Sequence, residues 1–200
     1  MKRITPLDRI ALLLTCLIAA YQVVVGVEGL PGLATWAYAT AFGVLLIAGL
    51  LMIINGFEVL DSPLVVIIAA IIPLGLSLGM VVEEFPAWSG GYTIFVVLGL
   101  LSILLSRFLL PERAAAIALS LVHGIAGLLI VGVPIALVVQ GTKPLLYLFV
   151  SVGGALIGAG GLLLALLKTG KPILSAERIF TLLPWILLLM SAAFVLGLGA

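Results

Sequence analysis

The sequence has very few charged side chains. Asp, Glu, Lys and Arg together make up 8% of the 200 residues, whereas soluble domains carry about 25%. So few charges are not enough to cover a water-facing surface. The formal net charge of +1 gives no electrostatic basis for binding nucleic acid. The low charge content therefore argues against a soluble domain and against a nucleic-acid-binding protein.

Cysteine and histidine are almost absent, since the chain contains only Cys16 and His123. A single cysteine cannot form an intrachain disulfide. A single histidine excludes a two-histidine haem site within one chain. The sequence shows no metal-ligand cluster, no phosphate-binding loop and no Ser/His/Asp set, and the last apolar segment lacks the lysine that a retinal protein needs. We therefore expect no enzyme and no metal site, and the sequence leaves any cofactor unknown.

Long apolar runs are what the sequence has instead, and 64% of its residues are hydrophobic. Uncharged runs of 18 or more residues are typical of membrane spans. Inside lipid the backbone must satisfy its own hydrogen bonds, so these runs should be helices. The sequence predicts an all-α integral membrane protein of about seven transmembrane helices, with residues 1–200 forming one polytopic domain. The segments lie near residues 10–27, 34–54, 63–82, 92–110, 114–139, 145–167 and 178–198.

Basic residues predict the orientation of these segments, because they collect on the cytoplasmic side. If the N-terminus is inside, the inner side holds Lys2, Arg3, Arg9, Arg107, Arg113, Lys168, Lys171 and Arg178. The outer side then holds only Lys143. The same orientation places Trp36, Tyr38, Trp88, Tyr92 and Tyr147 near the outer interface, where aromatic rings prefer to lie. We expect the N-terminus inside, the C-terminus outside, and a prokaryotic plasma (inner) membrane, which suits the short loops.

An internal repeat is suggested by residues 5–55, 60–110 and 111–168, which can each be read as a helical hairpin followed by a single last helix. The first hairpin contains a Pro-Gly turn at residues 31–32 and the run AFGVLLIAGLLMI at residues 41–53. It resembles the HdeD-like acid-resistance membrane proteins, and the third hairpin does so more loosely. The last helix and the acidic inner loop lie outside this pattern. The resemblance implies a small stress-related membrane protein and brings no catalytic residues with it.

His123 is the one ionisable side chain deep inside a predicted span, about 15 Å along the helix from Arg113. An ionisable residue at that depth suggests a function, here as a ligand or a proton relay. The alternative is a packing role, in which the imidazole bonds a neighbouring helix, and it is the one we expect. Small residues share that helix face, namely Ala116, Ser120, Gly124 and Gly127.

Prolines and glycines mark two further sets of candidate residues. Pro73, Ser77 and Pro134 lie within predicted helices, and interrupted helices build substrate pathways in transporters. Ordinary membrane helices also contain proline, so a purely structural role remains open. Two pairs of glycines four residues apart are expected to pack helices against each other within the fold, or against a partner: Gly75 with Gly79, and Gly154 with Gly158.

The acidic residues outside the spans fall into two pairs. Glu83 and Glu84 should be solvated in an outer loop, because the histidines that an intramembrane protease would need are missing. Glu58 and Asp61 lie in an inner loop, where basic residues of neighbouring loops can pair with them, namely Arg107, Arg113 or Lys168. Two carboxylates alone hold a divalent cation only weakly.

These observations favour a non-enzymatic multi-pass membrane protein that acts through helix–helix contacts. It would be an accessory subunit of a membrane complex or a small stress-related protein. Its partners would be membrane lipids and other membrane subunits or a second copy of the chain. The alternative is a small-solute or ion transporter or channel, with its site near His123 and the proline-interrupted helices.

Overall fold

The computed structural model describes residues 3–27, 29–30, 32–168 and 170–200, and these contain helices and short connections but no strand. The α-helices are α1 (Pro6–Val25), α2 (Gly32–Asn55), α3 (Pro63–Ala69), α4 (Ile71–Glu84), α5 (Ser89–Leu109), α6 (Glu112–Val139), α7 (Leu148–Lys168) and α8 (Ala176–Leu198). Three short 3₁₀ helices are η1 (Gly56–Asp61), η2 (Pro86–Trp88) and η3 (Leu145–Tyr147).

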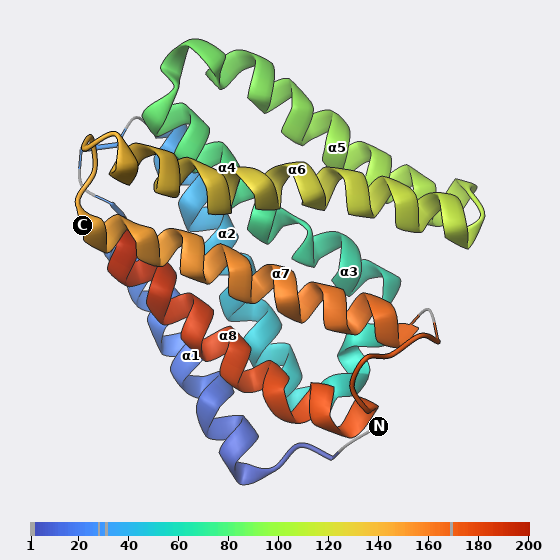
Figure 1. Ribbon diagram of the computed structural model, residues 1–200. Helices are drawn as coiled ribbons and strands as arrows, with labels where there is room; N and C mark the ends of the chain where they lie inside the picture. Colours follow the sequence, from blue (N-terminus) through green and yellow to red (C-terminus); the bar gives the residue numbers. More distant parts are fainter. Residues whose placement is uncertain (1–2, 28, 31, 169) are drawn as a thin grey trace.

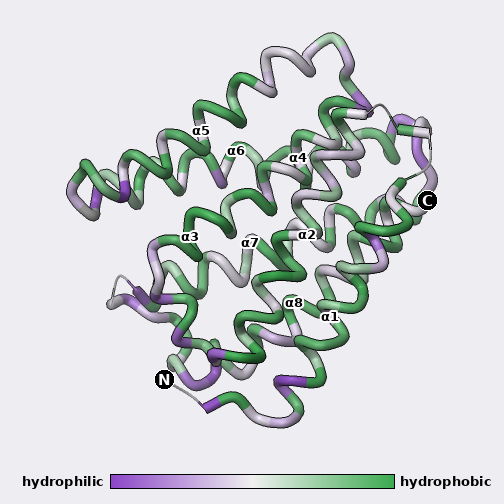
Figure 2. Tube along the Cα trace, turned by 180° about the vertical axis from the view of Figure 1, so that it is seen from behind, coloured by the Kyte–Doolittle hydropathy of each residue, from purple (hydrophilic) through white to green (hydrophobic). Residues whose placement is uncertain are grey.

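Among the described residues, seven helical segments are long and apolar enough to cross a membrane, with α3 and α4 together forming the third. This confirms the number and the helical character expected from the sequence, and it gives the chain the build of a multi-pass membrane protein. The hydrophobic residues follow the helices while the most hydrophilic ones gather at the ends of the bundle (Figure 2). The two chain termini lie at opposite ends (Figure 1). The α6–α7 connection, which contains Lys143, lies at the same end as the C-terminus, and we call this the Lys143 end. The α5–α6 connection, which follows Arg107, lies at the other end, which we call the Arg107 end.

The first helix begins earlier than the apolar run that predicted it. Thr5 and Asp8 form a capping box, in which the Asp8 amide donates to Thr5 Oγ1 at 3.2 Å and the Thr5 amide donates to Asp8 Oδ2 at 2.9 Å. Pro6 follows at the first helical position, where its missing N–H costs no hydrogen bond. Asp8 is only 2% exposed. Polar capping thus extends α1 by about one turn beyond the predicted start near residue 10.

The third span is interrupted, although the sequence predicted one segment over residues 63–82. The helix is broken at Ala70, between α3 and α4. Pro73 has no amide hydrogen for the Ala69 carbonyl, and its ring crowds that carbonyl. Pro134 and Pro184 lie inside α6 and α8, and neither helix is divided there. Of these three prolines, only Pro73 coincides with a break.

Helix α4 lies at the centre of the bundle and α5 lies at its edge (Figure 1). The third span is 72% buried within the protein, compared with 17% for the span that contains α5. Helix α4 packs against α2, α5 and α6. A membrane helix at the edge of a bundle keeps most of its apolar surface for lipid. Helix α5 can therefore remain hydrophobic on the surface that no other helix covers.

Two hydrophobic clusters lie toward the Arg107 end and share no described residue. One joins α3, α5 and α6 through residues such as Ile67, Ile103 and Val122. The other joins α1, α2, η1 and α8 around the stacked rings of Phe57 and Phe180, whose centroids are 5.2 Å apart. A third and larger cluster links α1, α2, α4, α6, α7 and α8. The buried hydrophobic residues therefore form one large cluster across the bundle, with smaller clusters beside it.

Candidate functional site

The most elaborate group of polar side chains lies at the Lys143 end. Lys143, in the connection between α6 and α7, donates to Glu83 Oε1 at 2.9 Å and approaches Glu84 Oε1 at 2.7 Å. Glu83 and Glu84 are the last two residues of α4. The carboxylate side chains are 16% and 12% exposed and the lysine side chain is 26% exposed. One ammonium group therefore bridges two largely buried carboxylates.

Two tyrosines complete this group, which we call the lysine cluster: Tyr38, Glu83, Glu84, Lys143 and Tyr147. The Tyr38 hydroxyl donates to Glu83 Oε2 at 3.2 Å, and the Tyr147 hydroxyl donates to Glu84 Oε1 at 3.3 Å. The lysine nitrogen also lies 4.8 Å from the centroid of the Tyr147 ring, within the range of a cation–π contact. The cluster joins α2, α4, the α6–α7 connection and η3 at one end of the bundle.

The charge of Lys143 is well supported. Burial lowers the pKa of its ammonium group, but the hydrogen bonds to Glu84 and Glu83 and the negative charges of both carboxylates raise it by more. The net direction of the pKa is upward, so Lys143 stays protonated at neutral pH. The cluster offers charge and hydrogen bonds, and this arrangement is suited to holding helices together.

The expectation that Glu83 and Glu84 are solvated was wrong. The chain connecting α6 to α7 lies against the end of α4 and covers both carboxylates. Sequence analysis missed Lys143 as their partner, although a signal was present. Lys143 was the only basic residue predicted on that side, and both acids and both tyrosines were predicted at the same interface.

His123 lies on α6 and is partly buried. Its Nδ1 atom is buried and has no hydrogen-bond partner among the described residues. The described residues contain no group of three or more His, Cys, Asp or Glu side chains that would hold a metal ion. The imidazole therefore belongs to no such cluster, and the backbone of Leu119, one turn earlier on α6, is a polar group within its reach.

Pro73 and Ser77 lie in the interior of the bundle. Ser77 is 0% exposed, and its hydroxyl donates to the backbone oxygens of Pro73 at 2.8 Å and Leu74 at 3.1 Å. The Tyr92 hydroxyl from α5 donates to Ser77 Oγ at 2.9 Å. Pro134 is also buried. The hydroxyls of Ser77 and Tyr92 are thus hydrogen-bonded within the protein.

The predicted packing glycines differ in their surroundings. A Cβ atom placed on Gly75 would lie 2.7 Å from the Ala37 carbonyl oxygen, and one on Gly79 would lie 2.7 Å from the Tyr38 ring. On Gly154 it would lie 2.6 Å from Ile130. On Gly158 it would meet nothing within 4 Å. Three of the four glycines therefore allow helices to approach closely, and the fourth has open space.

Asp61, one residue of the second acidic pair, contacts one of the basic residues predicted as its partner. Lys168 Nζ lies 3.7 Å from Asp61 Oδ1 and donates to the Leu60 carbonyl at 2.7 Å. Both side chains are substantially exposed, at 44% for Lys168 and 59% for Asp61. Exposed ion pairs of this kind contribute little to stability. The pair connects η1 to the end of α7.

Two residues named in the sequence analysis, Lys2 and Pro31, lie outside the described residues. Pro31 belongs to the Pro-Gly turn on which the family resemblance partly depends. The proposed repeat would place Gly43, Gly99 and Gly153 at similar positions in the second helix of each hairpin, and their surroundings differ. A Cβ on Gly43 would meet nothing within 4 Å, whereas one on Gly99 would lie 3.0 Å from Val122 and one on Gly153 would lie 2.8 Å from Phe194.

Comparisons with protein-family models, with curated proteins and with solved structures find no match for this chain.

Proposed function

We propose that this chain is a non-enzymatic multi-pass membrane protein that works by binding a helix of a partner between α6 and α7. The partner would be a subunit of a membrane complex or a second copy of the chain. The observation that carries this proposal is a small-residue face on each of the two helices, which continues beyond the point where they contact each other.

The contact between α6 and α7 lies toward the Lys143 end. There Gly154 packs against Ile130, and the Ser151 hydroxyl donates to the Val131 carbonyl at 2.7 Å. Helical spacing of four, seven and eleven residues places Gly158, Gly161 and Ala165 on the same face of α7 as Gly154. A Cβ on Gly158 or Gly161 would meet nothing within 4 Å. The face that contacts α6 therefore continues along α7 without a neighbour.

Helix α6 repeats this pattern. Ala116, Ser120 and Gly124 are exposed, and helical spacing places them, with Gly127, near the face of Val131. A Cβ on Gly124 or Gly127 would meet nothing within 4 Å. Helices α6 and α7 separate toward the Arg107 end (Figure 1). The small residues thus lie along the parts of α6 and α7 where the two helices diverge.

Such faces are typical of sites where a transmembrane helix docks closely. Glycine lowers helix stability by about 1 kcal/mol relative to alanine, so several glycines without an intramolecular contact indicate a contact with another chain. His123 lies next to this face on α6 and is partly buried.

Photo-crosslinking in native membranes tests the proposal. A diazirine amino acid replaces Ser120, and in a matched control it replaces the neighbouring Leu121, which is 63% exposed and lies about 100° around the helix. We expect a protein adduct from position 120 and mainly lipid adducts from position 121. Mass spectrometry of the adduct separates a second copy from a different subunit. Equal lipid labelling at both positions would count against a docked helix.

A transporter or channel is the second candidate, and the interruption of the third span at Ala70 favours it, because broken helices line substrate sites. Ser77→Cys in a Cys16→Ala background tests it by labelling with a membrane-impermeant thiol reagent. Labelling above that of the Cys16→Ala parent would support a water-accessible pathway. Its absence would agree with the complete burial of Ser77.

A further inference from the structure

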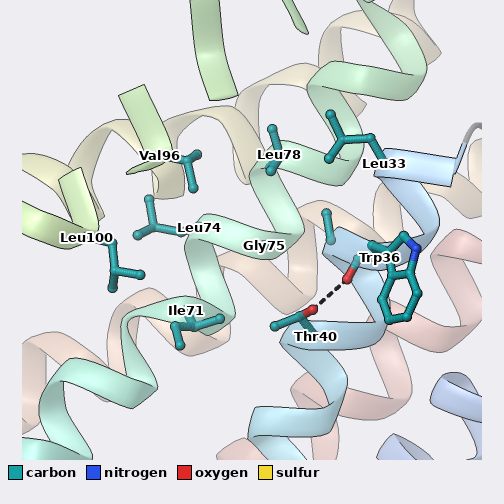
Figure 3. Close-up of a pocket in the computed structure, with 10 residues that line it drawn as sticks. Leu33, Trp36, Thr40, Ile71, Leu74, Gly75, Leu78, Val96 and Leu100 are labelled. Carbon is teal, nitrogen blue, oxygen red and sulfur yellow. Dashed lines mark hydrogen bonds between the residues drawn. The ribbon is translucent and has the colours of Figure 1, made fainter. Parts of the chain in front are cut away.

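A groove follows the surface of α4 between α2 and α5 (Figure 3). Leu74 and Leu78 of α4 form its floor, Trp36 and Thr40 of α2 lie on one side, and Val96 and Leu100 of α5 lie on the other. Its volume is about 230 Å³. It is separate from the lysine cluster and from the small faces of α6 and α7.

The groove exists because α2 and α5 both pack on α4 at different faces. Gly75 lets α2 approach α4 so closely that an added Cβ would lie 2.7 Å from the Ala37 carbonyl oxygen. Helix α5 packs on the adjoining face of α4 through Val96 and Leu100, which contact the cluster containing Leu74. The two flanking helices leave the surface between them uncovered.

The lining of the groove is almost entirely hydrocarbon. Its one hydroxyl, on Thr40, already donates to the Trp36 carbonyl at 2.7 Å (Figure 3). A water molecule needs two to four polar partners to be held in a cavity, and the described lining offers no such set. An apolar ligand is therefore favoured over water.

The length and lining of the groove favour a lipid chain over a helix. From Ile71 to Leu78 it follows about 10 Å of α4. That length is about two helical turns, whereas a transmembrane helix of about 20 residues packs along a much longer stretch. A chain of methylene groups fits a short apolar groove, because its carbon atoms pack about 4 Å from those of the lining side chains.

The position of the groove indicates the source of that chain. Its walls belong to three segments that are each long and apolar enough to cross a membrane, so the groove opens toward lipid. Trp36 is 74% exposed and lies in the second turn of α2, near one end of the span. Indole rings prefer the membrane interface, where the N–H can bond a lipid ester. We propose that this groove binds one acyl chain of a membrane phospholipid, with Trp36 beside its glycerol ester.

Photolabelling with a lipid tests this proposal. The full-length protein is reconstituted into phosphatidylethanolamine vesicles that contain a phospholipid with a diazirine on its acyl chain, and adducts are mapped by mass spectrometry. Ile71 of α4 lines the groove and is partly exposed, so a chain in the groove can reach it. We expect adducts on residues 71–78 of α4. A groove-filling variant, Leu100→Phe, should reduce them about tenfold, which corresponds to displacing about two methylene groups.

The matched control is Leu98→Phe, which makes the same chemical change on the same helix at a residue that is 60% exposed and does not line the groove. It should leave the α4 adducts unchanged. Size-exclusion chromatography confirms that both variants are folded. Absence of α4 adducts, or equal adducts in both variants, would overturn the proposal. Adducts in vesicles but none in native membranes would also overturn it, because a protein segment would then cover the groove.

Discussion

Replacing Lys143 with methionine is the sharpest test of the lysine cluster. Methionine has a similar length but no charge, so the variant leaves Glu83 and Glu84 adjacent and without a cation. Breaking a fully buried ion pair from one side costs about 3–5 kcal/mol. Here the three side chains are between 12% and 26% exposed, and partial solvation reduces that cost. We expect a destabilisation of about 2 kcal/mol.

The loss should appear as a lower midpoint of thermal unfolding in detergent. For a protein of this size, each 1 kcal/mol shifts Tm by about 2–4 °C, so K143M should unfold about 4–8 °C earlier than the wild type. The control is the triple variant E83Q/E84Q/K143M, in which the unpaired charges are gone and the tyrosine hydroxyls still have amide oxygens as acceptors. It should recover at least half of the loss.

The reasoning would be refuted if K143M unfolded at the wild-type temperature, because the buried carboxylates would then not need their cation. It would be refuted equally if the triple variant were as unstable as K143M, since the cost would then not come from unpaired charge. The same measurement on Lys168→Met provides a reference. That lysine is 44% exposed and pairs with a carboxylate that is 59% exposed, so its loss should shift Tm by less than about 2 °C.

Three further predictions concern the same fold. The pKa of Lys143 is raised in the folded protein. Its contribution to stability is therefore complete below the unfolded pKa of about 10.4 and is lost as pH rises through the higher folded pKa. The Tm difference between wild type and K143M should stay constant from about pH 7 to pH 10 and narrow above that. Gly75→Ala should destabilise the protein by about 1–3 kcal/mol because the new methyl group meets backbone, whereas Gly158→Ala should leave unfolding in detergent unchanged or raise its midpoint. Tyr92→Phe removes the hydrogen bond to Ser77 and should cost about 0.6 kcal/mol, as measured by the shift in Tm.

The number of spans was predictable from the sequence because it depends on the length of apolar runs, which a one-dimensional pattern records. The start of α1 at Pro6 was missed, because the capping box of Thr5 and Asp8 precedes the apolar run. The break at Ala70 was only partly predictable from the sequence. Pro73 was identified as a helix-interrupting residue, but nothing in the sequence says that it breaks its helix while Pro134 and Pro184 do not.

The lysine cluster was less predictable from the sequence than the spans. Its members were all predicted near one interface, yet the contact depends on the α6–α7 connection lying against the end of α4, which is a property of tertiary packing. The surroundings of the glycines were equally hidden. Gly154 and Gly158 form one pair four residues apart, and the sequence does not distinguish them. A Cβ atom on Gly154 would meet a neighbouring side chain, whereas one on Gly158 would meet nothing within 4 Å. Spacing identifies candidates for close approach, and the neighbours decide which of them are used.

The lysine cluster also has a consequence for how the protein is made. Glu83 and Lys143 are 60 residues apart in the chain. At a synthesis rate of about 5–20 residues per second, Glu83 exists for about 3–12 s before its lysine has been added. During that time the central span is already complete while its two carboxylates have no cation to pair with. The ion pair can form only after the connection to α7 has been synthesised. Its formation therefore follows the synthesis of the first helices and accompanies the docking of the C-terminal ones.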